Sequence, residues 1–212
     1  MGLFISMEGP DGSGKTLQMD MLQKALEEAG YPVLRTREPG GPAISERIRS
    51  LLLDPTCKEM SPETEALLYA AARAQHVSQV ILPALDEGKV VLCDRFVDSS
   101  LVYQGIGRGL GVSTIGAINR FATGGLQPDV TIVLQIDYAE GLRRKNIQYS
   151  GQLDRMEQQA GSFHQRVHDG FSQIVEWDPE RVRMVDGGKS PHEVHTMIME
   201  ALKPWLNRVL PQ

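Results

Sequence analysis

The chain contains 212 residues, of which 41% are hydrophobic and 23% charged, and its formal net charge is −5 at pH 7. This length and composition predict a single soluble domain with a substantial core. The mild negative charge gives no electrostatic reason to expect nucleic acid or a membrane as a partner, so we expect a small molecule. Because the sequence shows neither a targeting signal nor an apolar stretch of roughly 18 residues, we expect a cytoplasmic location.

The cysteines and histidines do not form a pattern that indicates a metal site. Two cysteines, Cys57 and Cys93, are too few for a disulfide framework and suggest a reducing compartment. Cys93 lies in an apolar run, where a buried thiol is the ordinary state. The five histidines lack the spacing of metal ligands, and His164 and His168 are expected on a polar helix face. No zinc site is therefore expected.

The first predicted strand, residues 3–7, leads directly into a glycine-rich octapeptide. This loop consists of Gly9, Pro10, Asp11, Gly12, Ser13, Gly14, Lys15 and Thr16. Its spacing, and its place between a strand and a helix, match a phosphate-binding P-loop. Glycines allow successive backbone N–H groups to point at phosphate oxygens, Lys15 can reach the terminal phosphates, and Thr16 can ligate Mg²⁺. We therefore expect the chain to bind a nucleoside triphosphate.

Helical patterns follow the loop and alternate with short apolar runs. The P-loop helix is expected to end before Gly30, and a second helix to start near Ser45. A third helix is expected to begin with Ser61 as its N-cap and to stop at Gly88. The last helix begins with a capping box at Ser190, and its apolar stripe is expected to belong to the core.

The remaining predicted strands are residues 33–36, 90–93, 130–136 and 182–185. Each is apolar enough to be buried on both faces, which is typical of a parallel sheet. Strands that alternate with helices form βαβ units. The sequence therefore predicts an α/β fold of the P-loop NTPase type, with a five-stranded parallel sheet flanked by helices. No linker or internal repeat divides residues 1–212, so we expect one domain.

The P-loop alone does not say where the phosphoryl group goes. The sequence lacks the guanine-reading Asn-Lys-x-Asp segment expected of a GTPase. Its length leaves little room for the additional modules of a motor or transport ATPase. A small kinase fits these observations better.

Three further segments carry a recognisable pattern. They are residues 36–41 (Thr-Arg-Glu-Pro-Gly-Gly), residues 63–73 (Glu-Thr-Glu-Ala-Leu-Leu-Tyr-Ala-Ala-Ala-Arg) and residues 92–105 (Leu-Cys-Asp-Arg-Phe-Val-Asp-Ser-Ser-Leu-Val-Tyr-Gln-Gly). Together with the P-loop, the chain from residue 3 to about residue 171 resembles the bacterial thymidylate kinase family. The resemblance implies transfer of the γ-phosphoryl group of ATP to dTMP with Mg²⁺, giving dTDP for dTTP synthesis by the de novo and salvage pathways. Bacterial relatives are generally homodimers, so a homodimer is expected by analogy.

The acceptor's own phosphate must be held by cations that face the P-loop, because phosphoryl transfer depends on positioning and charge neutralisation. Arg95 follows the predicted strand that ends at Cys93, which is where ligands bind in open parallel sheets. The resemblance implies that it grips the dTMP phosphate bidentately. Arg37 leaves the preceding strand in a similar way. The alternative for both arginines is an ion pair with Glu38 or Asp94.

Two carboxylates are expected near the metal and the acceptor sugar. Asp94 ends an apolar strand, so it can orient Mg²⁺ through water or fix the following arginine. In the family, the carboxylate at the position of Asp11 faces the acceptor sugar, where it can accept a hydrogen bond from the 3′-hydroxyl. The alternative for Asp11 is a residue that simply favours the turn.

Base recognition is expected from one helix face and from the segment that follows Arg95. Tyr69 and Arg73 lie four residues apart and therefore on one face of a helix. The resemblance places Tyr69 against thymine and Arg73 at a thymine carbonyl, although Tyr69 can also be ordinary helix packing. Gln104 can offer both a donor and an acceptor to the pyrimidine edge, and Tyr103 is assigned to the deoxyribose. The same pocket is expected to include Glu38, Arg49, Ser99 and Ser100.

A basic, polar stretch at about residues 143–160 resembles the lid of a nucleotide kinase. None of the variable P-loop positions is an arginine, so the positive charge for the transferring group must come from elsewhere. Arg143, Arg144 and Arg155 are the candidates for an arginine finger, and Arg155 fits best. The alternative for Arg155 is an exposed salt bridge with a neighbouring acidic residue.

Two other functions remain open at this point. One is a nucleoside-monophosphate kinase for dUMP, UMP or AMP, which the expected base-reading residues exclude only through the resemblance. The other is a nucleotide-binding switch without turnover. The cluster of Arg37, Arg73 and Arg95 argues against a switch, because a switch does not need a second phosphate pocket.

Overall fold

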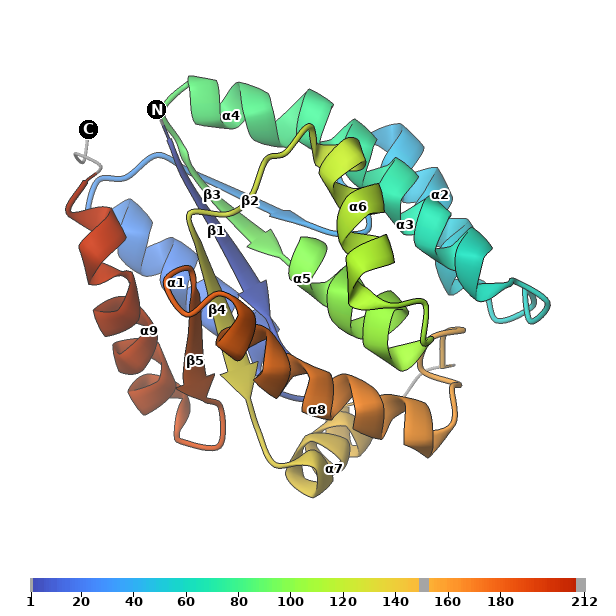
Figure 1. Cartoon of the computed structure of the whole chain (residues 1–212). Coiled ribbons are helices and arrows are strands. Elements are labelled where there is room, and N and C mark those ends of the chain that lie inside the picture. The colour runs from blue at the N-terminus through green and yellow to red at the C-terminus, as the bar shows by residue number, and fades with distance from the viewer. Residues whose placement is uncertain (1, 149–152, 209–212) are drawn as a thin grey trace.

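A five-stranded parallel sheet forms the middle layer of the protein (Figure 1). The computed structural model describes residues 2–148 and 153–208, without the side chains of residues 145, 146 and 148. In space the strands lie in the order β2-β3-β1-β4-β5. Their bounds are Leu3–Glu8 (β1), Val33–Arg37 (β2), Val90–Asp94 (β3), Val130–Gln135 (β4) and Val182–Asp186 (β5). The predicted fold class is confirmed.

Burial differs between the middle and the edges of the sheet. Nearly all residues of β1, β3 and β4 are buried, whereas β2 is half-buried throughout and ends on the exposed Arg37. β5 also alternates between buried and partly exposed residues. The prediction that each strand is buried on both faces is therefore wrong for β2 and β5, because an edge strand has a neighbour on one side only.

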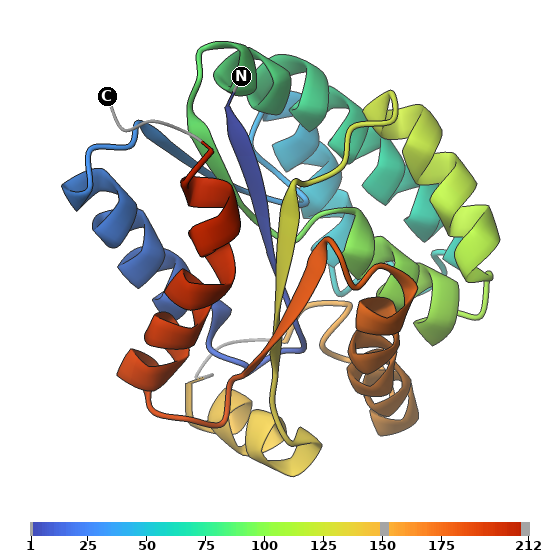
Figure 2. The same cartoon turned by 60° about the vertical axis from the view of Figure 1, so that its left-hand side comes forward.

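Helices cover both faces of the sheet, with α1 and α9 on one face and α4, α6 and α8 on the other (Figure 2). The longer helices are Lys15–Glu28 (α1), Ala43–Leu53 (α2), Pro62–His76 (α3), Val112–Thr123 (α6), Tyr138–Gln148 (α7), Gly161–Trp177 (α8) and Pro191–Leu206 (α9). Two shorter helices, Leu82–Asp86 (α4) and Val97–Ser100 (α5), adjoin the π-helical segments Val77–Ile81 (η1) and Leu101–Gly107 (η2). Among the described helices, none has the length and apolar character needed to cross a membrane.

The helix termini follow the predicted capping residues. The hydroxyl of Ser61 accepts a hydrogen bond from the N–H of Thr64 at the start of α3. The capping box of α9 forms between Ser190 and Glu193. The single helix predicted from Ser61 to Gly88 is instead α3, η1 and α4 in succession, because a π-helical turn interrupts the i→i−4 hydrogen-bond pattern.

The core lies on both faces of β1 and β3. On the α1 and α9 side, Leu22 and Ile198 are fully buried against the sheet. On the other side, Phe4 packs edge-on against Phe96 with ring centroids 4.9 Å apart. Cys93 is buried in this second cluster, as predicted. Burial of each large apolar side chain contributes about 1.5–3 kcal/mol, so the two clusters fix the sheet beneath the functional loops.

Candidate active site

The P-loop joins the carboxyl end of β1 to α1, and its backbone depends on glycine. Gly12 has φ +79°, and a Cβ there would collide with the carbonyl oxygen of Gly141 in α7. The side chain of Lys15 folds back over the loop, where Nζ donates to the carbonyls of Gly9 at 3.0 Å and Pro10 at 2.8 Å. Burial lowers the pKa of Lys15 to about 8. The ammonium therefore lies over the backbone of the P-loop.

Thr16 and Asp94 can serve a divalent cation. Thr16 lies in the first turn of α1 and is exposed. Oδ1 of Asp94 is buried and has no hydrogen-bond partner among the described residues, although a buried carboxylate oxygen normally has one. Hydroxyl and carboxylate oxygens, together with water and phosphate, are the ligands that Mg²⁺ prefers. These residues therefore fit a magnesium site beside the P-loop.

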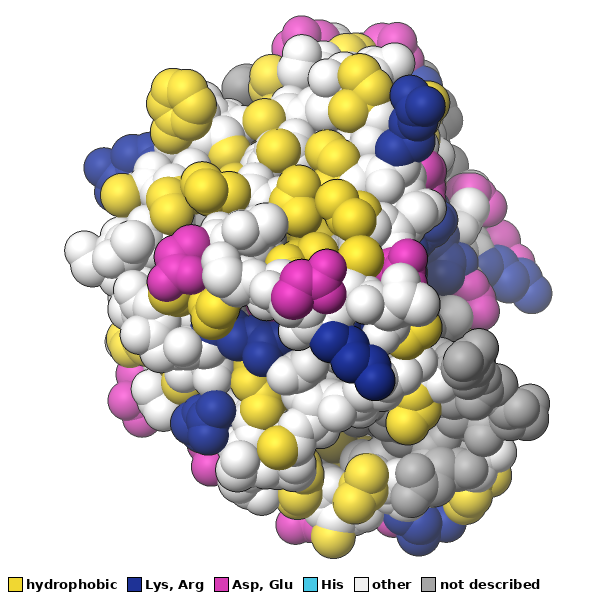
Figure 3. Space-filling view, turned by 90° about the vertical axis from the view of Figure 1, so that its right-hand side faces the viewer, with side chains coloured by type: hydrophobic (Ala, Val, Ile, Leu, Met, Phe, Trp, Pro, Cys, Tyr) yellow, Lys and Arg dark blue, Asp and Glu magenta, His cyan; other side chains and the backbone are white. Residues whose placement is uncertain are grey.

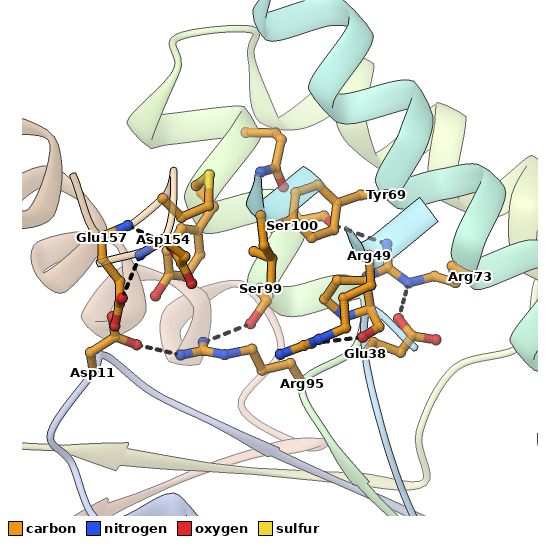
Figure 4. Close-up of a pocket in the computed structure, with 15 residues that line it drawn as sticks. Asp11, Glu38, Arg49, Tyr69, Arg73, Arg95, Ser99, Ser100, Asp154 and Glu157 are labelled. Atoms are coloured by element: carbon orange, nitrogen blue, oxygen red, sulfur yellow. Dashed lines mark hydrogen bonds and ion pairs between the residues drawn. The ribbon is translucent and has the colours of Figure 1, made fainter. Parts of the chain in front are cut away.

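Arg95 faces the P-loop from the turn that follows β3 (Figure 4). Its guanidinium pairs with Asp11 at 2.9 Å and donates to the carbonyl of Gly9 at 3.1 Å and to Ser99 Oγ at 3.2 Å. It also lies 5.2 Å from the ring centroid of Tyr103. Its φ of +69° is the one positive value at a non-glycine position in the part of the chain that the structure describes. Such strain is typical of functional sites.

Glu8 holds this turn, and the sequence analysis missed it because the predicted strand ended one residue earlier. The carboxylate accepts hydrogen bonds from the backbone N–H of Phe96 at 2.7 Å and from Ser99 Oγ at 2.5 Å. Burial and the nearby charge of Asp98 together raise the pKa of Glu8 from 4.5 to about 7. An acidic residue at the end of an otherwise apolar buried run was the available signal.

A cavity of about 210 Å³ opens beside Arg95, between α3 and residues 154–157 (Figure 4). The structure brings most of the predicted acceptor-site residues to its wall: Asp11, Glu38, Arg49, Tyr69, Arg73, Arg95, Ser99, Ser100, Tyr103 and Gln104. Residues that we did not predict also line it: Pro39, Leu53, Asp154, Met156 and Glu157. The cavity therefore lies next to the P-loop, at the carboxyl ends of β1 and β3.

Arg73 is almost completely buried, and its guanidinium is held by the protein. It donates to Glu38 at 2.6 Å, to Ser100 at 2.9 Å, to the carbonyl of Phe96 at 3.0 Å and to Asn119. A guanidinium has five N–H groups, so these four bonds leave one for a ligand. Glu38 thus acts as the partner of Arg73, and Asn119 is a contributor that the sequence motifs did not indicate.

The other base-pocket residues come from α3 and η2. Tyr69 lies one turn before Arg73 on α3, and burial raises the pKa of its phenol. Burial likewise raises the pKa of Tyr103, whose ring packs edge-on against Phe171 at 6.1 Å. Both phenols are therefore neutral at physiological pH. Gln104 donates its amide N–H to a buried carboxylate of α3.

Arg37 does not reach the cavity. Its side chain is 53% exposed and pairs with Glu46 at 3.0 Å. The ion pair with Glu38 or Asp94 that we considered is not formed. The edge position of β2 explains this, since side chains at an open edge turn readily to solvent.

The lid region is described in two parts, α7 and residues 153–160, and the predicted lid residues 149–152 lie outside the described residues. Arg155 does not contact the P-loop: it is buried, donates to the carbonyl of Leu52 at 2.7 Å and pairs with Glu65 at 2.8 Å. The predicted alternative, an exposed salt bridge, is wrong as well. Arg143 is exposed and pairs with Glu140 at 2.6 Å.

Arg144 is linked to the P-loop through Gly187. It pairs with Glu140 and donates to the carbonyl of Gly187 at 3.0 Å. Gly187 itself lies against the backbone of Ser13, because a Cβ there would be 3.0 Å from the Ser13 carbonyl oxygen. Gly141, three residues before Arg144, contacts Gly12 of the P-loop.

Three potential metal ligands also meet behind the cavity, within 4.8 Å of one another: Glu38, His76 and Cys93. Each is already hydrogen-bonded. Glu38 contacts Nδ1 of His76 at 2.8 Å, Nε2 of that histidine contacts Thr36 at 2.6 Å, and the thiol of Cys93 donates to the carbonyl of Arg95 at 3.0 Å. This arrangement fits a hydrogen-bond network that supports Arg73 and Arg95.

A P-loop that faces a second, arginine-lined cavity defines a class of protein: a P-loop kinase that phosphorylates a small nucleotide. The comparisons with known proteins agree. The model of the family described as "Thymidylate kinase" matches residues 7–198. The chain belongs to the thymidylate kinase family, and it is therefore an enzyme that phosphorylates dTMP to dTDP with ATP as the phosphoryl donor.

Individual relatives cover almost the whole chain. A thymidylate kinase of Bacillus licheniformis is 48% identical over 206 residues, covering 95% of this chain and 97% of the relative. One of Symbiobacterium thermophilum is 49% identical over 208 residues, covering 98% and 96%. The crystal structure of thymidylate kinase from Ehrlichia chaffeensis is similar with a TM-score of 0.77 and 33% identity, covering 95% of this chain and 98% of that one.

The raised pKa of Glu8 predicts a specific dependence of stability on pH. Below pH 4.5 Glu8 is protonated in both the folded and the unfolded chain. Between pH 4.5 and about 7 only the unfolded chain ionises, so the wild type loses free energy of unfolding as the pH rises. The neutral variant Glu8→Gln avoids this loss. Relative to the wild type, we expect the free energy of unfolding of Glu8→Gln to rise by up to about 3 kcal/mol between pH 4 and pH 8, measured by urea denaturation.

Glu27→Gln, on the exposed face of α1, serves as the control and should show no such trend. A difference between Glu8→Gln and the wild type that stays constant with pH would contradict the raised pKa.

Proposed function

We propose that the P-loop binds ATP, that the adjoining cavity binds dTMP, and that Arg95 holds the dTMP phosphate in line with the γ-phosphoryl group. The observation that carries this proposal is the ion pair of Arg95 with Asp11 at 2.9 Å. The pair supports the proposal because the cation that would meet the acceptor phosphate lies against the loop that would bind the donor. In-line transfer requires this proximity.

Binding of the substrates replaces contacts that the protein makes with itself. The ammonium of Lys15 moves from the carbonyls of Gly9 and Pro10 to the phosphates of ATP. The guanidinium of Arg95 exchanges Asp11 for the dTMP phosphate, and the released carboxylate accepts a hydrogen bond from the 3′-hydroxyl. Lys15 is already buried and Arg95 is half-buried against the P-loop, so both cations are largely in place when charge develops on the transferring group.

We also propose that Mg²⁺ accompanies ATP and is held through Thr16 and Asp94. Bound Mg²⁺ neutralises negative charge on the phosphates and helps to orient them. The buried, unpartnered Oδ1 of Asp94 supports this assignment, because it can accept hydrogen bonds from water bound to the metal.

Base recognition in this proposal uses the residues around the cavity. Tyr69 stacks on thymine, the remaining N–H of Arg73 donates to the C4 carbonyl, and Gln104 contacts N3. Tyr103 covers the deoxyribose and leaves no space for a 2′-hydroxyl. The four protein contacts of Arg73 support its role, because a fixed donor discriminates better than a mobile one.

For the charge on the transferring phosphoryl group, we propose Arg144 in preference to Arg155, with Arg143 as a second contributor. Arg144 belongs to the helix that contacts Gly12, and its bond to Gly187 keeps it beside Ser13. The Arg155 guanidinium is held instead by the carbonyl of Leu52 and by Glu65.

We further propose that the enzyme is a cytoplasmic homodimer that associates through α2, α3 and α6. Hydrophobic side chains gather on this face of the molecule (Figure 3). Phe121 of α6 is 92% exposed, and Leu67 of α3 is 57% exposed. A contiguous apolar surface of this kind marks an interaction site. The free thiols of Cys57 and Cys93 support a reducing compartment.

The first experiment measures ADP formation from Mg-ATP with dTMP, dUMP, UMP, CMP, AMP and GMP, each tested separately. We expect strong preference for dTMP, because Arg73 and Gln104 face the pyrimidine edge and Tyr103 faces the sugar. Preference for another monophosphate would keep the phosphoryl transfer but contradict the base-recognition model. Absence of turnover with all of them would favour a nucleotide-binding switch.

Removal of the Arg95 side chain should impair dTMP turnover without impairing ATP binding. We expect Arg95→Ala to lower kcat/KM for dTMP by about 10²–10³-fold, because a charged donor to the reacting phosphate is lost. Binding of an ATP analogue, measured by calorimetry, should change little. Arg35→Ala removes an arginine that pairs with Asp20 at the surface and should leave both quantities unchanged. Equal loss of ATP binding and dTMP turnover in Arg95→Ala would contradict the assignment.

The dimer can be tested by analytical ultracentrifugation. The wild type should sediment as a dimer, and Phe121→Asp should sediment as a monomer, because a charge in an apolar interface is not solvated. Met184→Asp places the same charge on β5, at the other edge of the sheet, and should remain dimeric. A wild-type protein that is monomeric at all concentrations would contradict the proposal.

A further inference from the structure

Glu65 is a buried carboxylate that does not line the cavity but contacts a residue that does. It lies on α3, one turn before Tyr69, and is 1% exposed. Its Oε1 accepts a hydrogen bond from Nε2 of Gln104 at 3.0 Å. Its Oε2 accepts from Arg108 at 2.8 Å and pairs with Arg155, also at 2.8 Å. Gln104, in contrast, is part of the cavity wall.

Glu65 is ionised at physiological pH. Burial by itself raises the pKa of this carboxyl group, but the hydrogen bonds from Arg108 and Gln104 and the charges of Arg108 and Arg155 outweigh burial and lower it. An ionised carboxylate carries no proton and can only accept hydrogen bonds. The atom of Gln104 that meets Glu65 must therefore be the amide nitrogen.

This constraint determines which end of the Gln104 amide remains for a ligand. A glutamine amide has one accepting oxygen and one donating nitrogen, and a rotation of its plane exchanges them. Glu65 engages the nitrogen through one of its two N–H groups, which fixes the nitrogen on the side of α3 and makes the oxygen the accepting end left for the cavity. Among the described residues, no hydrogen bond involves the side-chain oxygen of Gln104. This oxygen is also not one of the fully buried polar atoms that lack a partner.

The pyrimidine bases differ at the atom that such an oxygen would meet. Thymine carries a hydrogen on N3, which donates, whereas N3 of cytosine has a lone pair, which accepts. An accepting oxygen therefore binds thymine and repels cytosine, while an amide free to rotate serves both. Buried polar groups that are left unpaired make such discrimination strong.

We propose that Glu65 is a positioning residue that determines base specificity: it forces Gln104 to present its oxygen, and the acceptor site thereby selects the N3–H of thymine over N3 of cytosine. The inference rests on the proposed binding of dTMP in this cavity. It also gives a role to Arg155 and Arg108. They keep Glu65 charged, and Arg108 extends the network to Gln159 at 2.6 Å, in the second part of the predicted lid.

The test compares kcat/KM for dTMP with kcat/KM for 5-methyl-dCMP, which keeps the methyl group and changes only the recognition edge. In Glu65→Gln the new side chain can donate as well as accept, so Gln104 is able to rotate. We expect the preference for dTMP to fall about tenfold or more, the equivalent of one hydrogen bond. Glu63→Gln, on the exposed side of the same helix, should keep the wild-type preference.

A second variant controls for the lost charge beside Arg108 and Arg155. The exchange Glu65→Gln with Gln104→Glu keeps one carboxylate in the pair and again presents only accepting oxygens to the base. We expect it to restore most of the preference. The inference would be overturned by a folded Glu65→Gln variant that keeps the wild-type preference for dTMP. It would also be overturned by a folded exchange variant whose preference for dTMP is as low as that of Glu65→Gln.

A measurement on the wild type does not depend on folding of the variants. The N3-methyl analogue of dTMP keeps both carbonyls and replaces the N3–H donor with a methyl group. We expect kcat/KM for this analogue to be at least about tenfold lower than for dTMP, and equal use of the two would overturn the inference. Failure of the wild type to phosphorylate dTMP would instead contradict the proposed function, so the two failures are distinguishable.

Discussion

The turn after β3 is the constraint on which the rest of the site depends. The N–H of Arg95 donates to the carbonyl of Met7 at 3.0 Å, and the N–H of Phe96 donates to Glu8 at 2.7 Å. Both acceptors belong to β1, the strand that carries the P-loop. The strained backbone of Arg95 is therefore stabilised by the donor side of the site. As a consequence, the arginine and the P-loop keep a fixed distance, which in-line transfer between two phosphates needs.

Buried charges around the cavity likewise fix the positions of its side chains. Arg73 and Glu38 are each almost completely buried, as are Glu65 and Arg155, and each is held by several partners. Buried ion pairs of this kind contribute little net stability, because desolvation offsets the attraction between the charges. Their value here lies in orientation: a guanidinium with four protein contacts offers its last N–H in one direction only. The structure thus uses buried charge to fix geometry.

Local sequence signals predicted the P-loop, the five strands and the pairing of Tyr69 with Arg73 on one helix face. Each depends on spacing within a short segment, which propensity and periodicity determine directly. Glu8 and Glu65 escaped prediction because their roles depend on contacts 88 and 39 residues away. We assigned Arg37 and Arg155 to the site because they lie near the motifs in the sequence. In the structure, Arg37 stands on an edge strand and turns to solvent, whereas Arg155 is held by the buried carboxylate of Glu65. Long-range pairing of charged side chains decides such positions, and no local pattern reports it.

Helix α3 connects these observations, because it carries three residues of the proposed acceptor site at four-residue spacing: Glu65, Tyr69 and Arg73. In the proposed roles, Glu65 orients a neighbouring amide, Tyr69 offers an aromatic surface and Arg73 donates a hydrogen bond. All three lie on one face of a rigid element, so their relative positions follow from helix geometry alone. The Ser61 cap and the packing of α3 against α2 and α6 fix the rotation of that face. A rotation of α3 would move all three contacts together. The surface proposed for dimerisation includes this helix, so a partner subunit on α3 would hold the base-reading face in place.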